Sequence, residues 1–436
     1  VGTSSAAMTV AAKVNGDTIT KQLQVTINKD QRKLLAAETG VAFSSTPSWS
    51  RLSRTIKISD NFGLDGAWSA SSNKSWLSVT ASGRTAGGAG TLSLSANPAS
   101  LPLNQISYAT VTLSSTEDGV TAPETIQVAL WKGSVTPTAQ AKAALHYTTL
   151  VADPIRPLVY VHDSASSLDV YNIYTGAKVA TIASLGASLA GMTVSPNGDT
   201  LYVFDTANRT IVLLDLATLS KTGSWAMPVM ATASSRMVAM HPNGVNVVLT
   251  NGNGSFLAPT GALLGASFST GEMAASGDGR RLFSDGGSAY SIDFTAINGG
   301  TLLASRYATL YSGSSGDIAS NLDGSRFYTT GNYTSRCSIM SGDNASQIGN
   351  LPGGDNSYYP INVEVASDGR VFCGNSNYYG VADVWVHRAD GTLQTTFKLS
   401  GTGRTLLARQ MVISGDALMV AGLTDEPSLV FTPVGP

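Results

Sequence analysis

The residues best suited to chemistry are tyrosines that stand beside asparagines in the second half of the chain. A tyrosine ring offers a flat face to the C–H surface of a sugar, and a large contact area to a protein at small entropic cost. The accompanying amides, in Asn356-Ser357 and Asn375-Ser376-Asn377, can hydrogen-bond hydroxyl groups. The pattern favours a face that binds glycan or protein, and the simpler alternative is that each tyrosine covers the rim of its own structural unit. The residues of this predicted face are Tyr311, Tyr333, Tyr358, Tyr359, Tyr378 and Tyr379.

A second group of polar residues occupies corresponding positions in the successive repeats described below. These residues are Arg236, Glu272, Asp317, Asn362 and Gln410. Two carboxylates beside an arginine make a poor metal site, so we predict no metal and no other cofactor. The alternatives are an entrance for a small ligand or cation, and a ring that only holds water and internal salt bridges.

Sequence signatures of catalysis are absent. The chain has no G-x-S-x-G elbow, no H-E-x-x-H motif, no C-x-x-C pair and no phosphate-binding glycine loop. The histidines, His146, His162, His241 and His387, are scattered, and His241 occupies a turn position that serine fills elsewhere. This favours a protein that is not an enzyme. An enzyme whose site is assembled from distant loops, such as a lactonase, lyase or quinoprotein-like protein, stays open as an alternative.

The two cysteines, Cys337 and Cys373, are too few for a disulfide framework or a structural zinc site. They fall in neighbouring repeats, so one bridge between them is an option, and two buried thiols are the other.

Composition narrows the class of protein. Charged residues make up 13% of 436 residues and the formal net charge is −2, with no basic run that would attract nucleic acid. No apolar stretch approaches the roughly 20 residues that cross a bilayer, so membrane insertion is not expected. The 45 glycines and the absence of a helical apolar period favour many short strands joined by tight turns.

An internal repeat marks the N-terminal region. Residues 22–30 recur as residues 125–133, a spacing of 103 residues, and Ala7-Met8-Thr9-Val10 echoes Ala109-Thr110-Val111-Thr112. Such spacing is typical of tandem immunoglobulin-like sandwiches. We therefore expect residues 1–30 to be the terminal hairpin of a preceding sandwich repeat, so that the chain opens inside an array. Copies of the chain itself are one expected partner of the exposed strands of this hairpin.

Residues 31–133 should then be one full immunoglobulin-like β-sandwich. The core Ser75-Trp76-Leu77-Ser78-Val79 and the later strand Tyr108-Ala109-Thr110-Val111-Thr112-Leu113 resemble BACON domains, bacterial immunoglobulin-like modules named for a proposed link to carbohydrate. The resemblance implies a secreted, cell-surface or periplasmic setting. Trp68 and Trp76 are expected to pack the sandwich core rather than to bind a ligand.

Residues 134–436 carry a different period, in which two apolar strands flank a tight turn. The turn glycines Gly198, Gly244, Gly279, Gly324 and Gly369 are spaced by 46, 35, 45 and 45 residues, the length of one four-stranded propeller blade. Ser195-Pro196-Asn197-Gly198 followed by Leu201-Tyr202-Val203 resembles the YVTN family of β-propeller repeats. The predicted fold is therefore all-β, a seven-bladed β-propeller preceded by an immunoglobulin-like β-sandwich. Residues 134–143 should supply the outermost strand of the last blade and close the ring.

The order of strands in a blade divides its loops between two faces. Turns between the first and second strands lie on one face, and the tyrosine-bearing loops lie on the other. The sequence thus predicts a non-catalytic, secreted or cell-surface bacterial protein that binds or adheres to glycan or protein. A structural subunit of a surface layer, sheath or filament is the alternative.

Overall fold

The computed structural model describes most of the chain, and its regular elements there are β-strands and two short 3-10 turns, Ala86–Gly88 and Pro242–Gly244. The residues described are 2–228, 232, 236–252, 254–258, 260–265, 271–284, 288–295, 300–309, 315–331, 336–353, 360–375, 382–399 and 406–436. Within them, no helix is long and apolar enough to cross a membrane.

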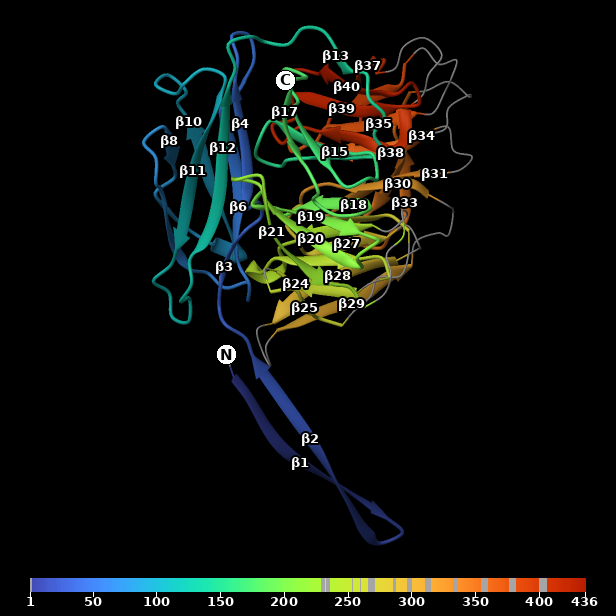
Figure 1. The fold of residues 1–436 in the computed structure, drawn as a ribbon. Coiled ribbons are helices and arrows are strands. Elements are labelled where there is room, and N and C mark those ends of the chain that lie inside the picture. The colour runs from blue at the N-terminus through green and yellow to red at the C-terminus, as the bar shows by residue number, and fades with distance from the viewer. Residues whose placement is uncertain are drawn as a thin grey trace.

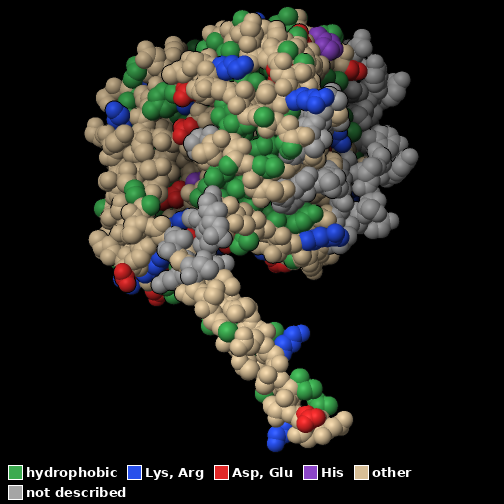
Figure 2. Space-filling view, turned by 60° about the horizontal axis from the view of Figure 1, so that its bottom comes forward, with side chains coloured by type: hydrophobic (Ala, Val, Ile, Leu, Met, Phe, Trp, Pro, Cys, Tyr) green, Lys and Arg blue, Asp and Glu red, His purple; other side chains and the backbone are tan. Residues whose placement is uncertain are grey.

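The chain begins with a long hairpin that projects away from the rest of the molecule (Figures 1 and 2). Strand β1 (Gly2–Val14) pairs with β2 (Asp17–Lys29) along their whole length and forms a sheet of two strands. The turn residues Asn15 and Gly16 both have positive φ, 53° and 92°. An Asn-Gly pair supplies this geometry at little cost, and it matches the right-handed twist of the two strands.

A sandwich of two sheets follows. One sheet has the order β3-β6-β10-β8 and the other β5-β4-β12-β11-β7-β9. The side chains between the sheets form one core, with Ile56, Leu92, Val111 and Ile126 all 0% exposed. Trp68 and Trp76 belong to this core. The strands are β3 (Leu34–Ala36), β4 (Gly40–Ser45), β5 (Ser50–Arg51), β6 (Ser53–Asp60), β7 (Ala67–Ser72), β8 (Leu77–Val79), β9 (Ser82–Arg84), β10 (Ala89–Ala96), β11 (Gln105–Ser114) and β12 (Glu124–Lys132).

The pairing registers correct the alignment of the internal repeat. Met8 lies opposite Leu23 in the hairpin, and Val111 lies opposite Ile126 in the sandwich. Met8 therefore corresponds to Val111, at the same 103-residue offset as the second strands. The echo at Ala7 was placed one residue out, because short runs of Ala and Thr match at either position.

The remaining strands form seven sheets of four strands in the described residues. The first three sheets are β14 (Thr149–Ala152), β15 (Leu158–His162), β16 (Leu168–Asn172), β17 (Lys178–Ile182); β18 (Leu189–Val194), β19 (Thr200–Asp205), β20 (Thr210–Asp215), β21 (Ser220–Ala226); and β22 (Met237–Met240), β23 (Val247–Thr250), β24 (Gly254–Leu257), β25 (Ala262–Leu263). The next two are β26 (Met273–Ala275), β27 (Arg281–Ser284), β28 (Ser288–Thr295), β29 (Thr301–Thr309); and β30 (Ser315–Ser320), β31 (Arg326–Gly331), β32 (Ser338–Ser341), β33 (Gln347–Asn350). The last two are β34 (Pro360–Val365), β35 (Val371–Asn375), β36 (Val384–His387), β37 (Leu393–Phe397); and β38 (Leu406–Ile413), β39 (Met419–Thr424), β40 (Ser428–Pro433), β13 (Ala141–Ala143).

These sheets are the blades of a closed ring (Figure 1). The inner strand of each blade contacts the inner strand of the next, and β38 of the last blade contacts β14 of the first. Strand β13, from the 134–143 segment, pairs with β40 and completes the last blade. The propeller predicted from the turn spacing is confirmed.

A tight turn joins the first and second strands of each blade, and in several blades the side chain of its leading residue holds it. The hydroxyl of Ser195 accepts hydrogen bonds from the N–H groups of Asp199 and Thr200, both at 3.0 Å. Ser276 accepts one from Arg281, and Ser414 one from Met419. Side chains of this kind compete well for backbone donors in turns, so the serine and the glycine together specify the bend. We call these seven bends the inner turns.

The sandwich packs against the propeller face that carries the inner turns. Gly40 of β4 lies against Pro196, and Ala42 lies beside Gly415 and Pro154. Trp131 of β12 shares an apolar cluster with Tyr174 and other residues of the first and last blades. Side chains at these turns thus serve as a docking surface, whereas the sequence predicts only a local structural role for them.

Candidate functional site

The predicted ring of polar residues lies at the end of the propeller channel opposite the sandwich. Arg236 precedes the inner strand of the third blade, and its Nε donates to Glu272 Oε1 of the fourth blade at 2.7 Å. Arg409, on the inner strand of the seventh blade, lies 3.1 Å from the same oxygen. Arg409 also donates to the carbonyl of Gly316 in the fifth blade. These contacts join four blades across the mouth of the channel.

Sequence reasoning missed Arg409, although it adjoins the predicted Gln410. Its backbone has φ 62°, in the left-handed region that residues other than glycine rarely adopt. It sits where the pairing of β38 with β39 shifts register. Such a bulge interrupts the alternation of side chains along the strand, and the sequence has no periodic pattern that would predict it.

The other predicted ring residues link the inner strands of neighbouring blades. Asp317 Oδ2 accepts the N–H of Val363 at 2.9 Å, and Asn362 Oδ1 accepts the N–H of Gln410 at 2.7 Å. Gln410 Oε1 in turn accepts the N–H of Leu150 at 3.0 Å. The chain of bonds runs from the fifth blade through the sixth and seventh to the first. These side chains thus hold neighbouring blades together at this end of the ring, where Asn362 is fully buried.

Burial changes the protonation of two carboxyl groups in the channel. Burial raises the pKa of Asp317 to about 7, although the Val363 N–H opposes the shift. Burial also raises the pKa of Glu364 well above its usual range, and the nearby charge of Asp317 adds to this. The channel interior therefore disfavours negative charge at neutral pH.

The predicted tyrosine face cannot be placed from side chains. Tyr311, Tyr333, Tyr358, Tyr359, Tyr378 and Tyr379 all lie outside the described residues. In the sequence, their segments stand between the second and third strands of a blade, or between one blade and the next.

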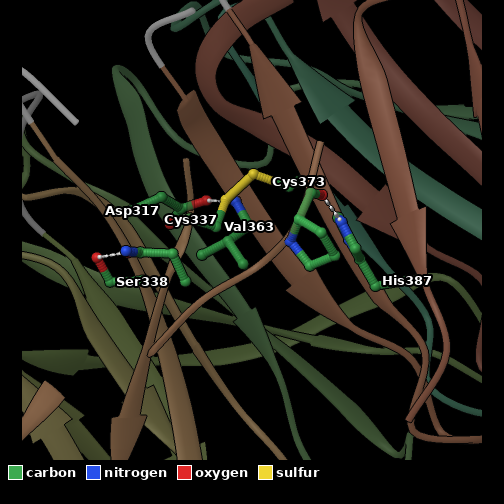
Figure 3. Close-up of a disulfide and its surroundings, with 8 residues drawn as sticks. Asp317, Cys337, Ser338, Val363, Cys373 and His387 are labelled. Carbon is green, nitrogen blue, oxygen red and sulfur yellow. Dashed lines mark hydrogen bonds between the residues drawn. A yellow bond between two sulfur atoms is a disulfide. The ribbon is translucent and has the colours of Figure 1, made fainter. Parts of the chain in front are cut away.

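A disulfide joins Cys337 to Cys373, with a Cα–Cα distance of 6.2 Å (Figure 3). Cys337 stands just before β32 of the fifth blade, and Cys373 lies in β35 of the sixth. In sequence, one follows the segment with Tyr333 and the other precedes the segment with Tyr378 and Tyr379. The bridge and the neighbouring bond from Val363 to Asp317 therefore fasten the fifth and sixth blades to each other.

A cavity of about 450 Å³ lies where the sandwich meets the other end of the channel. On the sandwich side, Arg54 pairs with Glu38 and donates to the carbonyl of Ser367, while Arg51 lies 2.5 Å from Asp368. Glu364 lines the propeller side. Burial raises the pKa of Glu38, with the Arg54 guanidinium opposing the shift. The cavity has a mixed apolar and polar lining, and the Arg51–Asp368 pair and the bond from Arg54 to Ser367 bridge the two parts of the molecule.

Further contacts continue around the docked face. His241 Nε2 lies 3.0 Å from Glu124 Oε1 of β12, and Lys33 Nζ donates to the carbonyl of Asn243 at 2.9 Å. Arg280 donates to Ser59 Oγ at 3.1 Å. The sequence signal for the contact with Glu124 is that His241 occupies a turn position that serine fills in other repeats.

Among the described residues, no group of three or more His, Cys, Asp or Glu side chains could hold a metal ion. His162 and His387 are buried against carbonyl oxygens, those of Ala190 and Pro352. Burial lowers the pKa of both imidazoles, which suits a structural role.

Comparison with known proteins supports the fold alone. No protein-family model and no curated protein matches the sequence. Among solved structures, the β-propeller domain of Cps50 (Swd1) from Myceliophteria thermophila matches with a TM-score of 0.51 and 10% identity, covering 68% of this chain and all of that domain. The chain therefore contains a β-propeller.

Proposed function

We propose that this chain is a non-catalytic binding protein that contacts a glycan or a protein through the loop face of its propeller. The carrying observation is the position of the sandwich. It occupies the face with the inner turns through charged and apolar contacts, so a large partner has the opposite face available to it. That face carries the polar residues around Glu272 and Asp317, and we infer that it carries the tyrosine segments as well.

Contacts between neighbouring blades make the ring a rigid scaffold for such a face. Hydrogen bonds between inner strands and the disulfide fasten the fifth, sixth, seventh and first blades to one another. Loops on a rigid scaffold bind with less entropic loss than loops on a soft one.

A secreted or cell-surface location in a bacterium is part of the proposal. Disulfides persist in oxidising compartments and are rare in the cytosol, so the bridge between Cys337 and Cys373 supports export. The resemblance of residues 31–133 to BACON domains agrees with the same setting.

The test is to replace Tyr358, Tyr359, Tyr378 and Tyr379 with alanine and to measure retention on a glycan array and on immobilised surface proteins. We expect loss of binding of at least about tenfold, since each aromatic anchor contributes on the order of 1 kcal/mol or more. A matched variant replaces Val179, Ile348 and Leu393, exposed side chains of outer strands, with alanine. Equal retention of both variants would show that the tyrosines do not form the binding face.

A second candidate function is that of a structural subunit in a layer, sheath or filament. The projecting hairpin favours it, because its strand edges are exposed to pairing with another chain. Ordered assemblies of the purified protein in electron micrographs would support this function, and dispersed single particles would count against it.

A further inference from the structure

All the large apolar side chains of the N-terminal hairpin lie on one of its faces. Residues opposite one another in an antiparallel pair share a face, and Met8 faces Leu23 while Val10 faces Lys21. The other face carries Ser, Thr, Ala, Lys and Gln. The apolar side chains are Met8, Val10, Val14, Ile19, Leu23, Val25 and Ile27, each between 40% and 64% exposed.

An isolated hairpin of this kind has no evident source of stability. Two strands alone are marginally stable in water, and a hydrophobic face needs a second layer to cover it. Every described side chain from Ser4 to Ile27 is exposed, so the rest of the molecule does not provide that layer. Figure 2 shows the hairpin extending from the body with solvent on both sides.

The internal repeat indicates which kind of sheet would cover the apolar face of the hairpin. Residues 4–30 align with residues 107–133 at an unbroken offset of 103, with Gly16 matching Gly119 at the turn. Both hairpins also pair their strands in equivalent register. The second of them, β11–β12, is the last hairpin of the sandwich.

The burial of matched positions differs completely. Ile126, Val128 and Leu130 of β12 are 0%, 1% and 0% exposed in the sandwich core. Their counterparts Leu23, Val25 and Ile27 are 44%, 40% and 64% exposed. The hairpin thus carries core-forming side chains without a core. In the sandwich, β12 pairs in parallel with β4, and β11 pairs with β7, so the partner strands are defined as well.

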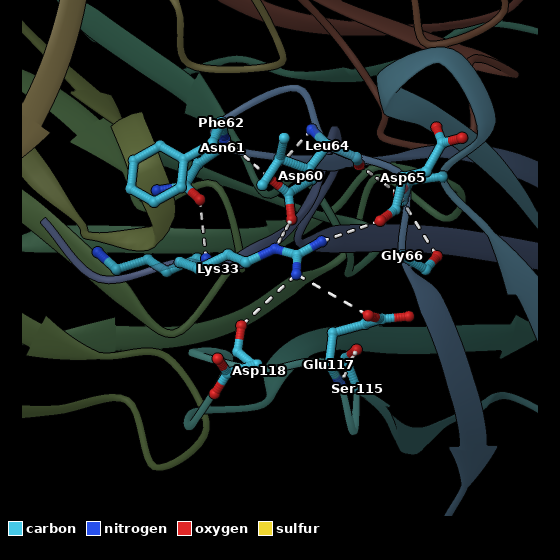
Figure 4. A network of polar contacts seen from close by, with 12 residues as sticks. Lys33, Asp60, Asn61, Phe62, Leu64, Asp65, Gly66, Ser115, Glu117 and Asp118 are labelled. Carbon is cyan, nitrogen blue, oxygen red and sulfur yellow. Dashed lines mark hydrogen bonds and ion pairs between the residues drawn. The ribbon is translucent and has the colours of Figure 1, made fainter.

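The base of the hairpin is fixed to the sandwich (Figure 4). Arg32 Nε donates to Asp60 Oδ2 at 2.6 Å, and Arg32 Nη2 donates to the carbonyl of Asp65 at 3.1 Å. The N–H of Lys33 donates to Asn61 Oδ1 at 2.8 Å. These bonds begin three residues after β2 ends, so the hairpin leaves the body from a firmly held point.

We propose that β1–β2 is the closing hairpin of a second sandwich. Its occupant is a polypeptide with the construction of β3 to β10 that lacks a hairpin equivalent to β11–β12. A strand equivalent to β4 pairs in parallel with β2, one equivalent to β7 pairs with β1, and the apolar face completes the core. The inference is independent of what the propeller binds.

The test is a chimera in which a copy of residues 31–106 precedes Ser4 of the full chain, so that Ser4 takes the place of Ser107. We expect the amides of Leu23, Val25 and Ile27 to exchange hydrogen on the order of 100-fold more slowly than in the unmodified chain. Replacing these three residues with lysine in the chimera should abolish the protection. Replacing Gln22, Gln24 and Thr26, on the polar face, with lysine should preserve it.

A second chimera shows that an added sandwich can fold at this position. It carries a copy of residues 31–133, with its own closing hairpin, directly before residue 31 of the chain. Protection of that copy's hairpin, without protection of β1–β2 in the first chimera, would overturn the proposal. So would dimers of the unmodified chain in light scattering that the Leu23, Val25 and Ile27 lysine variant abolishes, because the occupant would then be a second copy.

Discussion

At the scale of single residues, the sequence indicates which polar side chains occupy corresponding positions in the repeats. It does not indicate which residues these side chains contact. The polar ring residues were found because the inner turns align the repeats, and the structure places them at one end of the channel. Arg409 and the pairs Glu38–Arg54 and Arg51–Asp368 were not found. Their partners lie 16 or more residues away in sequence, and neither a spacing nor a motif connects them.

His241 gives the clearest prediction at this scale. The Glu124 carboxylate raises the pKa of the His241 imidazole above its usual 6.5, although burial opposes the shift, and Asn246 and Lys33 are its other neighbours. A raised pKa in the folded state means that this group stabilises the fold fully below about pH 6.5 and loses that effect as pH rises through the folded-state value. His162 and His387, whose pKa values are lowered, act in the opposite direction.

We therefore expect His241→Gln to lower the free energy of unfolding by about 1–2 kcal/mol at pH 5.5, the size of a charge-assisted hydrogen bond. The difference from the unmodified protein should shrink toward pH 8.5. Urea unfolding across this range measures it, with His146→Gln, an exposed position, as the control. A difference that is constant with pH would contradict the assignment of charge to His241.

At the scale of elements, the repeats made the blades predictable. Turn glycines and capping serines act locally, so they appear in the sequence at regular spacing. The closing strand β13 was predicted because the last blade needs a fourth strand besides the three in residues 406–433. Sequence resemblance alone left open whether Cys337 and Cys373 are joined, since that depends on how two neighbouring blades face each other.

The disulfide should contribute measurably to stability. It closes a loop of 36 residues between the fifth and sixth blades. The loss of chain entropy in the unfolded state predicts about 4 kcal/mol for a loop of this size, and measured values are commonly about 2–4 kcal/mol. The variant with alanine at both Cys337 and Cys373 should unfold at a lower urea concentration. Its free energy of unfolding should be lower than that of the unmodified protein by that amount. The unmodified protein treated with reductant should match it, and equal stability of the oxidised and reduced forms would be evidence against a bridge.

At the scale of the whole molecule, the sequence predicts two parts, and the structure shows how they are joined. The sandwich docks against the inner turns. The glycines and serines of these turns are already explained by the turn geometry, so they do not indicate a second role in docking. Docking requires the backbones of the two parts to approach closely. A side-chain carbon added at Gly40 would lie 2.8 Å from Ile155 Cγ2 and closer still to the carbonyl oxygen of Pro196.

Gly40→Val should therefore separate the sandwich from the propeller without unfolding either. We expect a larger radius of gyration in X-ray scattering and faster tryptic cleavage at Lys142, next to the connecting segment. Gly223→Val is the matched control, because an added carbon at Gly223 meets nothing within 4 Å. If both variants scatter and digest like the unmodified protein, the two parts are not held by this contact.

The pairing of β13 with β40 has a mechanical consequence. Ala141, at the start of β13, lies opposite Phe431, near the end of β40. Tension between the N-terminal parts and the C-terminus therefore pulls on adjacent ends of an antiparallel pair and breaks its hydrogen bonds one at a time, the weakest way to load such a pair. Tension between the sandwich and a partner held on the loop face is shared among many inner turns instead. The molecule is thus better suited to bear force between the sandwich and the opposite end of the propeller than between its two termini.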